Sequence, residues 1–375
     1  MAGWAVVIVG MGSLHLHSHL RKYALGISVL LVAAGISMAA DGVPEVPKSA
    51  RVALSENWSS GKIDPAKWYV PRKMWGHGNS GVNPENVFIA RDTVGGREQN
   101  VLVCEAHGDL YDGSVVGYDG VKTRVGGVIV SKEFFASGRF EIVMKIGDSK
   151  AHDGGPADPR QLKGCIPALW TYAYRYLSGE AILGATGLKE LTSEIDFPEL
   201  GKGGDFAHGL YNCYLQTRDD CKVYEVNIAD GQYHTFVTEW RTKLEPIDGI
   251  SDAHVKEYGG FWWITDKAVP LAKHDLNPLK KLGENKYAIY RGATAEHWID
   301  GKKVGENVKF VPAMAAQLNI GVWLPNWAGK AEWKTARVSF ASVKIWQYDD
   351  PGDVRGILTA DLDDNYDKSG NALKK

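Results

Sequence analysis

The amino-acid sequence predicts an all-β sandwich with large loops. Short apolar stretches alternate with turns rich in glycine, aspartate and asparagine, a pattern typical of β-strands joined by tight connections. Amphipathic windows long enough for a helix are nearly absent. A single domain over residues 51–350 is an acceptable length for this fold class.

The expected strands are short segments enriched in β-branched and aromatic residues. In chain order they are Asn86 to Ala90, Val101 to Ala106, Gly138 to Ile146, Tyr211 to Gln216, His234 to Trp240, Ala288 to Tyr290, Glu296 to Gly301 and Val338 to Tyr348. Two polar stretches interrupt them, Gly147 to Lys163 and roughly Thr242 to Gly259. Because long loops in compact domains are usually functional or mobile, we expect both to shape the rim of a cleft.

The composition is that of an ordinary globular protein. The chain has 375 residues, of which 44% are hydrophobic, and a formal net charge of -2 without a long basic run. Nucleic acid is therefore not expected as a partner. The 13 tryptophans and 16 tyrosines either pack the core or line a carbohydrate-binding cleft, since sugar C–H faces stack on aromatic rings that keep a polar edge.

The N-terminus has the pattern of a signal peptide. Arg21 and Lys22 precede an apolar run from Ala24 to Ala34, and the small residues Ala39 and Ala40 follow. The apolar run is short for a membrane-spanning helix. We therefore expect a secreted or periplasmic protein without membrane contact after cleavage, with an uncleaved N-terminal anchor as the alternative. The expected organisation is a signal peptide at 1–40, a linker at 41–50, a catalytic domain at 51–350 and a polar tail at 351–375.

Four cysteines, Cys104, Cys165, Cys213 and Cys221, are present. An exported protein could oxidise them. Cys213 and Cys221 flank a polar turn, so a bridge across this hairpin is one candidate pairing, although sequence alone does not choose among the pairings. Free buried thiols are at least as well supported for Cys104 and Cys165.

The segment from Glu194 to Glu199 holds three carboxylates in an apolar setting. Side chains of a strand alternate between faces, so Glu194 and Asp196 share a face. Regular alternation would turn Glu199 away from them. Because proline within a sheet is found at edges and bulges, Pro198 favours a β-bulge, and one extra residue returns Glu199 to the face of the other acids.

Such a group of carboxylates has the residue types needed for glycoside hydrolysis. Retaining enzymes need two carboxyl groups about 5–5.5 Å apart, one nucleophilic and one acid/base. A third carboxylate between them, here Asp196, can orient the nucleophile and keep the neighbouring acid protonated. The alternative is a solvent-facing acidic strand. Ile195 and Phe197 alternate with the acids, which indicates one packed face and favours catalysis.

The pattern E-x-D-x-x-E resembles the bulged signature of glycoside hydrolase family 16, which includes laminarinases, agarases and carrageenases. Other family motifs are matched in the same order along most of the chain. They are Asn57-Trp58 with Gly61 to Trp68, Ser131-Lys132 with Gly138 to Glu141, Cys165 to Trp170, His234 to Trp240, Trp298 to Gly301 and Val343 to Gln347.

The resemblance implies a β-jelly-roll of two curved antiparallel sheets with an open cleft, and retaining, endo-acting hydrolysis. It implies that Glu194 is the nucleophile, Asp196 the assisting residue, Glu199 the acid/base and Trp170 a cleft aromatic. Many members carry a structural calcium held partly by an aspartate of the last strand. The matching position here is Ala341, which argues against that ion, and no other cofactor is expected.

The sequence does not identify which polysaccharide is the substrate. Laminarinases usually have methionine before the last glutamate, where this chain has Pro198, and unbulged xyloglucan-type members read E-I-D-F-E. The bulge remains the better interpretation, because Glu199 would otherwise turn toward the core. A β-1,3- or mixed-linkage glucan and a marine galactan are the candidate substrates.

Four further residues are candidates for substrate binding. His208 and Asn212 follow the acidic strand by one hairpin and either bind sugar hydroxyls or satisfy a turn. Trp327, beside a glycine turn, either stacks on sugar or packs the sandwich. Trp75 falls where family members line the cleft.

Three arginines, Arg124, Arg139 and Arg175, could bind the sulfate of a galactan, with ordinary surface charge as the default interpretation. The histidines show no ligand spacing, so no catalytic metal is expected. Two alternatives to hydrolysis stay open, a transglycosylase using the same site and a non-catalytic carbohydrate-binding module. In each case the expected partner is a polysaccharide and the expected state a monomer.

Overall fold

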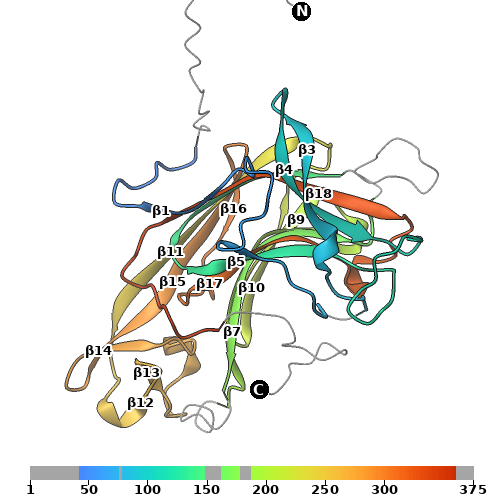
Figure 1. Cartoon of the computed structure of the whole chain (residues 1–375). Coiled ribbons are helices and arrows are strands. Elements are labelled where there is room, and N and C mark those ends of the chain that lie inside the picture. Colours follow the sequence, from blue (N-terminus) through green and yellow to red (C-terminus); the bar gives the residue numbers. More distant parts are fainter. Residues whose placement is uncertain (1–41, 76–77, 148–161, 178–186, 360–375) are drawn as a thin grey trace, which may run out of the picture. The chain divides into compact units, whose positions relative to one another are not determined.

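Two antiparallel β-sheets face each other across a shared hydrophobic core in the computed structural model of the chain (Figure 1). The structure describes residues 42–75, 78–147, 162–177 and 187–359. Within these ranges the regular elements are strands and short 3₁₀ turns, without an α-helix. The predicted fold class, an all-β jelly-roll sandwich, is confirmed. The signal peptide predicted at 1–40 and most of the loop predicted at Gly147 to Lys163 lie outside the described residues.

The larger sheet has eleven strands in the described part of the chain, in the order β12-β13-β14-β15-β11-β6-β18-β4-β3, with β1 paired to β18 and β16 to β15. They are β1 (Arg51–Glu56), β3 (Val87–Val94), β4 (Arg97–His107), β6 (Gly138–Ile146), β11 (Tyr233–Ile247), β12 (Val255–Tyr258), β13 (Phe261–Ile264), β14 (Leu279–Gly283), β15 (Lys286–Ile299), β16 (Lys302–Asn307) and β18 (Thr335–Gln347).

The smaller sheet has seven strands among the described residues, in the order β10-β9-β8-β7-β17-β5-β2. They are β2 (Trp68–Tyr69), β5 (Gly127–Phe135), β7 (Ile166–Tyr176), β8 (Glu190–Leu200), β9 (His208–Leu215), β10 (Arg218–Glu225) and β17 (Ala316–Trp323). The acidic segment lies in β8, which is flanked by β7 and β9. The short turns η1 (Pro84–Asn86), η3 (Lys202–Gly204), η4 (Asp252–His254), η5 (Leu271–Lys273) and η6 (Asn326–Ala328) connect strands.

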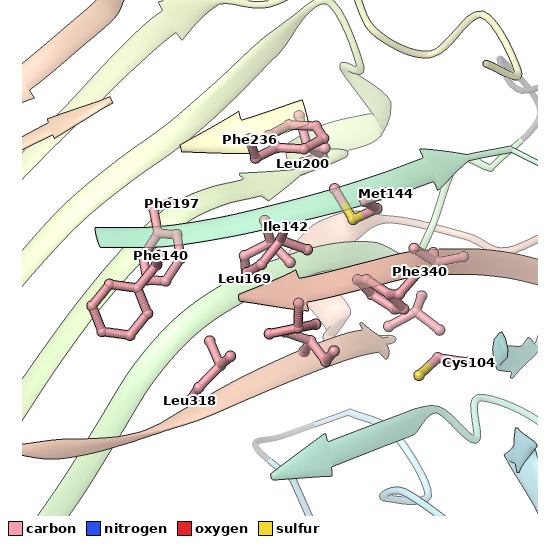
Figure 2. Close-up of a cluster of buried hydrophobic side chains, with 14 of the residues drawn as sticks. Cys104, Phe140, Ile142, Met144, Leu169, Phe197, Leu200, Phe236, Leu318 and Phe340 are labelled. Atoms are coloured by element: carbon pink, nitrogen blue, oxygen red, sulfur yellow. The ribbon is translucent and has the colours of Figure 1, made fainter. Parts of the chain in front are cut away.

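The core between the sheets is built from alternate residues of the central strands. In β6, Phe140, Ile142 and Met144 are buried in it, because every second side chain of a strand faces the same way. Figure 2 shows these residues facing Leu169 and Phe197 of the smaller sheet. The rings of Phe140 and Phe197 lie 5.6 Å apart. This contact joins the larger sheet directly to the strand that carries the acids.

Two predictions about chain segments are wrong. The stretch from Thr242 to Gly259 is not a long loop, because β11 runs on to Ile247 and β12 begins at Val255. The strands predicted at Ala288 to Tyr290 and Glu296 to Gly301 are one strand, β15. Strands β12 to β14 extend the larger sheet and have a small core of their own, formed by Ile250, Val255, Ile264, Leu279, Tyr287 and Ile289.

The tail predicted at 351–375 is not peripheral over its described part. Val354 and Ile357 are buried against Met314 in a second hydrophobic cluster. Asp353 accepts hydrogen bonds from the Ser137 amide and the Thr242 hydroxyl. Residues 360–375 lie outside the described residues. Leu358 belongs to the same cluster. The polar composition of the whole tail did not reveal that these three apolar side chains anchor its first part.

The proposed Cys213–Cys221 bridge is also wrong. Cys213 pairs with Asp220 across the β9–β10 hairpin, whereas Cys221 pairs with Asn212. The two thiols are therefore on opposite faces, with Cys213 in the core and Cys221 exposed. All four cysteines are free, and Cys104 and Cys165 are buried as predicted.

Among the described residues no helix is long and apolar enough to cross a membrane.

A buried histidine links the sheets beneath β9. His297 contacts the Thr238 hydroxyl through Nδ1 and the Asn307 carbonyl oxygen through Nε2, both at 3.0 Å. Asn307 in turn donates to the backbone oxygens of Tyr211 and Asp220. Burial lowers the pKa of His297 from its ordinary 6.5 to about 4, while the hydrogen bond that Asn307 Oδ1 accepts from it acts in the opposite direction.

This shift predicts acid sensitivity. Below pH 6.5 the histidine is protonated in the unfolded chain, whereas in the folded protein it stays neutral down to about pH 4. The free energy of unfolding therefore falls by about 3 kcal/mol as the pH is lowered from 6.5 to 4. Urea unfolding of the wild type and of His297→Gln, measured from pH 7.5 to 4, should show the smaller decrease in the variant. Equal decreases would contradict the prediction, and His208→Gln, at an exposed histidine, serves as the control.

Candidate active site

Strand β8 carries a bulge at the predicted place. On the β9 side, Asp196 pairs with Asn212 and Glu199 with Leu210, so β8 has one residue more than its neighbour between these pairs. The register with β7 shifts in the same interval. The extra residue lies in the Phe197–Pro198 pair, whose peptide bond is cis. The prediction that Pro198 marks a β-bulge is confirmed.

The bulge separates the side chains of β8 into two sets. Ile195, Phe197 and Leu200 are buried in the core between the sheets. Asp196 bonds to Asn212, and Glu199 opens onto a pocket beside the same asparagine. The acids are therefore on the outer face of the smaller sheet, which we call the cleft face.

Glu194 is half-buried on the cleft face. Its neighbours in the adjacent strands are Tyr172 of β7 and Tyr214 of β9. Tyr214 also lines the pocket that contains Glu199. The tyrosines thus flank the first acid of the segment on both sides.

Asp196 is buried and has a specific partner. It is 2% exposed, and the Asn212 side-chain amide donates a 3.0 Å hydrogen bond to its Oδ2. Burial raises the pKa of Asp196 to about 7, while the hydrogen bond from Asn212 acts in the opposite direction. Asn212 therefore stabilises the charged form of a carboxyl that burial would keep neutral.

The surroundings of Glu199 favour the protonated form of its carboxyl. Burial raises the pKa of its carboxyl well above the ordinary value, the negative charge of Asp196 adds to this effect, and the ammonium group of Lys202 opposes it. A carboxyl whose pKa is raised is suited to serve as a general acid. Two neighbouring carboxyls whose surroundings push one toward the acid form are typical of acid/base sites.

A pocket of about 390 Å³ opens beside Glu199. Its walls come from the end of β8, from β9 and β10, and from the η6 turn. They are formed by Glu199, Lys202, Leu210, Asn212, Tyr214, Cys221, Lys222, Val223 and Trp327. Polar atoms beside an exposed tryptophan ring are a suitable surface for a sugar, which has polar edges and apolar faces.

The structure brings some of the predicted binding residues together and leaves others apart. Asn212 and Trp327 line the pocket with Glu199. Trp170 lies beside Asp196 in the register of β7 and β8 but is only 6% exposed. Its ring packs edge-on against Trp75 at 5.6 Å. These two tryptophans belong to a hydrophobic cluster on the cleft face.

His208 lies at the start of β9 and is outside the pocket lining. Its Nδ1 is 2.8 Å from Oδ2 of Asp205, and both side chains are exposed. His208 lies on the same face of β9 as Asn212, which follows four residues further along the strand. The contact with Asp205 fits the turn-satisfying alternative at this residue.

Sequence reasoning missed several pocket residues. Leu210 and Tyr214 are each two residues from Asn212, so the alternation of a strand could have found them. Cys221 and Val223 follow from the β9–β10 register, which depends on the length of the hairpin turn. Lys202 had no signal, because it follows the strand in the η3 turn.

Two of the three arginines considered for sulfate binding are engaged inside the protein. Arg139 pairs with buried Glu239 and also donates to the Pro44 carbonyl. Arg124 donates to backbone carbonyls of two loops. Arg175 lies 5.3 Å from the ring of Tyr258. These contacts explain the charges without an anionic ligand.

The described residues contain no cluster of three or more His, Cys, Asp or Glu side chains suited to a metal ion. Ala341, where the resemblance described above would place a calcium-binding aspartate, packs with Val101 and Val103 in an apolar cluster. The residues around it therefore do not fit a calcium ion.

No family model and no curated protein matches this chain. Solved structures do match it. The laminarinase catalytic domain from Thermotoga maritima is 17% identical over 80% of this chain and 98% of its own, with a TM-score of 0.48. The Bacillus licheniformis β-glucanase is 13% identical over 78% and 96%, with a TM-score of 0.45. A family 16 glycoside hydrolase from Bacteroides ovatus, in complex with a mixed-linkage glucan product, is 14% identical over 78% and 99%, with a TM-score of 0.46.

The two lysines of the pocket are expected to differ in their effect on the pKa of Glu199. Because the charge of Lys202 lowers the pKa of Glu199, Lys202→Ala should raise that pKa further. Lys222 lines the same pocket but is ion-paired with Asp220 at 3.2 Å, so Lys222→Ala should leave it unchanged. Carboxyl ¹³C NMR titration of selectively labelled glutamate measures both. A lowered or unchanged Glu199 pKa in Lys202→Ala would contradict the assignment.

Proposed function

We propose that this protein is a retaining, endo-acting glycoside hydrolase of family 16 that cleaves internal β-linkages of a polysaccharide. One observation carries the proposal: the bulge in β8 gives Glu194, Asp196 and Glu199 a common face, with the pKa of Glu199 raised beside a sugar-sized pocket. The family motifs along the sequence support it independently.

In the proposed reaction, Glu199 donates its proton to the glycosidic oxygen while Glu194 attacks the anomeric carbon. The glycosidic bond breaks, one part of the polymer leaves, and the other is bound to Glu194 as an ester. Glu199 then removes a proton from water, whose oxygen attacks the same carbon and releases Glu194. Asp196 orients the nucleophile, and its charge raises the pKa of Glu199.

The proposed substrate is a β-1,3- or mixed-linkage glucan or a marine galactan. Trp327 would stack on a sugar face, and Asn212 would orient Asp196 while contacting a hydroxyl. The protein would act as a monomer outside the cytoplasm after signal cleavage, without nucleic-acid partner or cofactor. A membrane-anchored form with an uncleaved N-terminus is the alternative location.

Product stereochemistry is the decisive test. Proton NMR during hydrolysis should show the anomer of the substrate linkage first, because two inversions restore the configuration. Initial appearance of the opposite anomer would exclude the mechanism. Release of reducing ends from laminarin, mixed-linkage glucan, agarose, porphyran and carrageenan identifies the polymer. Products longer than the starting oligosaccharide would instead indicate transglycosylation.

Azide distinguishes the roles of the two glutamates. Glu194→Gln and Glu199→Gln should each reduce kcat by about a hundredfold or more. With an activated aryl glycoside, azide should give the retained glycosyl azide in an alanine or glycine variant of Glu199, because it attacks the covalent intermediate. In the matching Glu194 variant it should give the inverted azide by direct displacement.

The control is Glu225→Gln, at an exposed residue of β10, which should keep full activity. An inactive parent that still binds polysaccharide would support the carbohydrate-binding module instead. Identical azide products from both variants would contradict the assignment of nucleophile and acid.

A further inference from the structure

Arg124 fastens a loop at the rim of the pocket. Its Nη2 donates to the carbonyl oxygens of Leu324 at 3.0 Å and Pro325 at 2.9 Å. Its Nη1 donates to the carbonyl oxygen of Gly329 at 3.3 Å. These carbonyls lie on both sides of Trp327 in residues 324–331, which we call the Trp327 loop. The guanidinium thus holds both ends of the turn that carries the exposed pocket tryptophan.

The same side chain reaches a second loop. Its Nε donates to the Gly78 carbonyl at 2.8 Å, in residues 73–83, of which 76 and 77 lie outside the described part. A Cβ added at Gly78 would be 2.6 Å from the Cβ of Asn326. Gly78 also has a φ of +75°, so glycine is required there for both reasons. The described part of this segment, which we call the Trp75 loop, touches the Trp327 loop at Gly78, and Arg124 binds both.

Asp109 completes the clamp. Its Oδ1 lies 3.3 Å from Nη1 of Arg124, and its Oδ2 accepts a 2.8 Å hydrogen bond from the Ala331 amide. The Asp109 amide donates to the Ala331 carbonyl at 2.7 Å. The carboxylate therefore neutralises the arginine and fixes the end of the Trp327 loop with one group. Hydrogen bonds from a charged donor are stronger than those between neutral groups.

The backbone of Arg124 is held in an uncommon conformation. Its φ is +58°, in the left-handed region that residues other than glycine rarely adopt. Its carbonyl accepts a hydrogen bond from the Ser80 amide at 3.0 Å. Such backbone is maintained where surrounding structure requires it, often at functional sites. Here the residue with this unfavourable backbone conformation is the one whose side chain binds the two loops.

The Trp327 ring is partly exposed at the pocket. It is 40% exposed, and its ring contact is edge-on to Trp323 at 5.7 Å. Its loop contacts the η3 turn, which follows Glu199. A ring that is already in place loses less conformational freedom when a sugar binds.

We propose that Arg124 is a positioning residue for carbohydrate binding, which presets the Trp327 ring at the pocket by clamping the Trp327 loop to the Trp75 loop. This inference rests on the proposed glycosidase function. The carboxylates lie on β8, outside the two clamped loops, so we expect substrate binding to be affected more than the chemical step.

Steady-state kinetics test the proposal. Arg124→Ala should raise KM for the polymer about five- to tenfold while kcat changes less than about twofold. Arg124→Lys should fall between, since lysine keeps the charge but not the fork of donors. Trp327→Ala should match Arg124→Ala, and the double variant should be no worse than either, because both act through one ring. An unchanged KM in Arg124→Ala, or additive effects, would overturn it.

Arg241→Ala is the matched control. Arg241 makes two hydrogen bonds to Asp350, at 2.7 and 2.8 Å, on a strand of the larger sheet. The Arg241→Ala substitution removes a comparable ion pair but leaves the contacts of both loops intact. The KM of this variant should therefore equal that of the wild type. Each variant is measured below its own thermal transition.

A measurement without substrate separates this inference from the proposed function. In protein labelled with 5-fluorotryptophan, Trp327→Phe identifies the ¹⁹F resonance of Trp327. Arg124→Ala should shift or broaden that resonance, and Arg241→Ala should not. An unmoved resonance overturns the inference even in an active enzyme. A wild type that cleaves no polysaccharide overturns the proposed function, while the resonance still reports on the clamp.

Discussion

The site depends on how β8 divides its side chains between two environments. Ile195 and Phe197 are buried between the sheets, and each gains about 2 kcal/mol from leaving water. A slip of one residue would exchange the buried and exposed sets, so the core determines where Glu194 and Asp196 point. The bulge adds a residue without such a slip, because β8 is again paired with both neighbours at Glu199.

This arrangement has an electrostatic consequence. The sheet that positions the carboxyls also removes them from water, and burial is the first cause of the raised pKa values of Asp196 and Glu199. Asn212 offsets part of this effect for Asp196, and Asp196 in turn makes ionisation of Glu199 less favourable. One asparagine on the next strand therefore influences the protonation of an acid that it does not bind. Raised pKa values of neighbouring buried carboxyls are typical of functional sites.

The sequence predicted what short-range rules determine. Alternation and one proline were enough to place the bulge and the shared face of the acids, because both are properties of a single strand. Features that depend on register between strands were not predictable. The Cys213–Cys221 bridge failed because the hairpin offsets the two cysteines by one position. The pocket residues Cys221 and Val223 were missed for a similar reason, since they join the wall only through the pairing of β9 with β10.

The contacts of Arg124 position loops of the pocket, whereas β8 positions the carboxyl groups. Arg124 binds Leu324, Pro325, Gly329 and Gly78 through their carbonyl oxygens, which every residue possesses. Side chains of the Trp327 loop can therefore change while the clamp persists, provided that the backbone keeps its path. The carboxyls on β8 are independent of those side chains. A fold of this type can thus alter the surface that a polysaccharide meets without disturbing the acids that would cleave it, which explains why the reaction is easier to infer from this chain than the polymer.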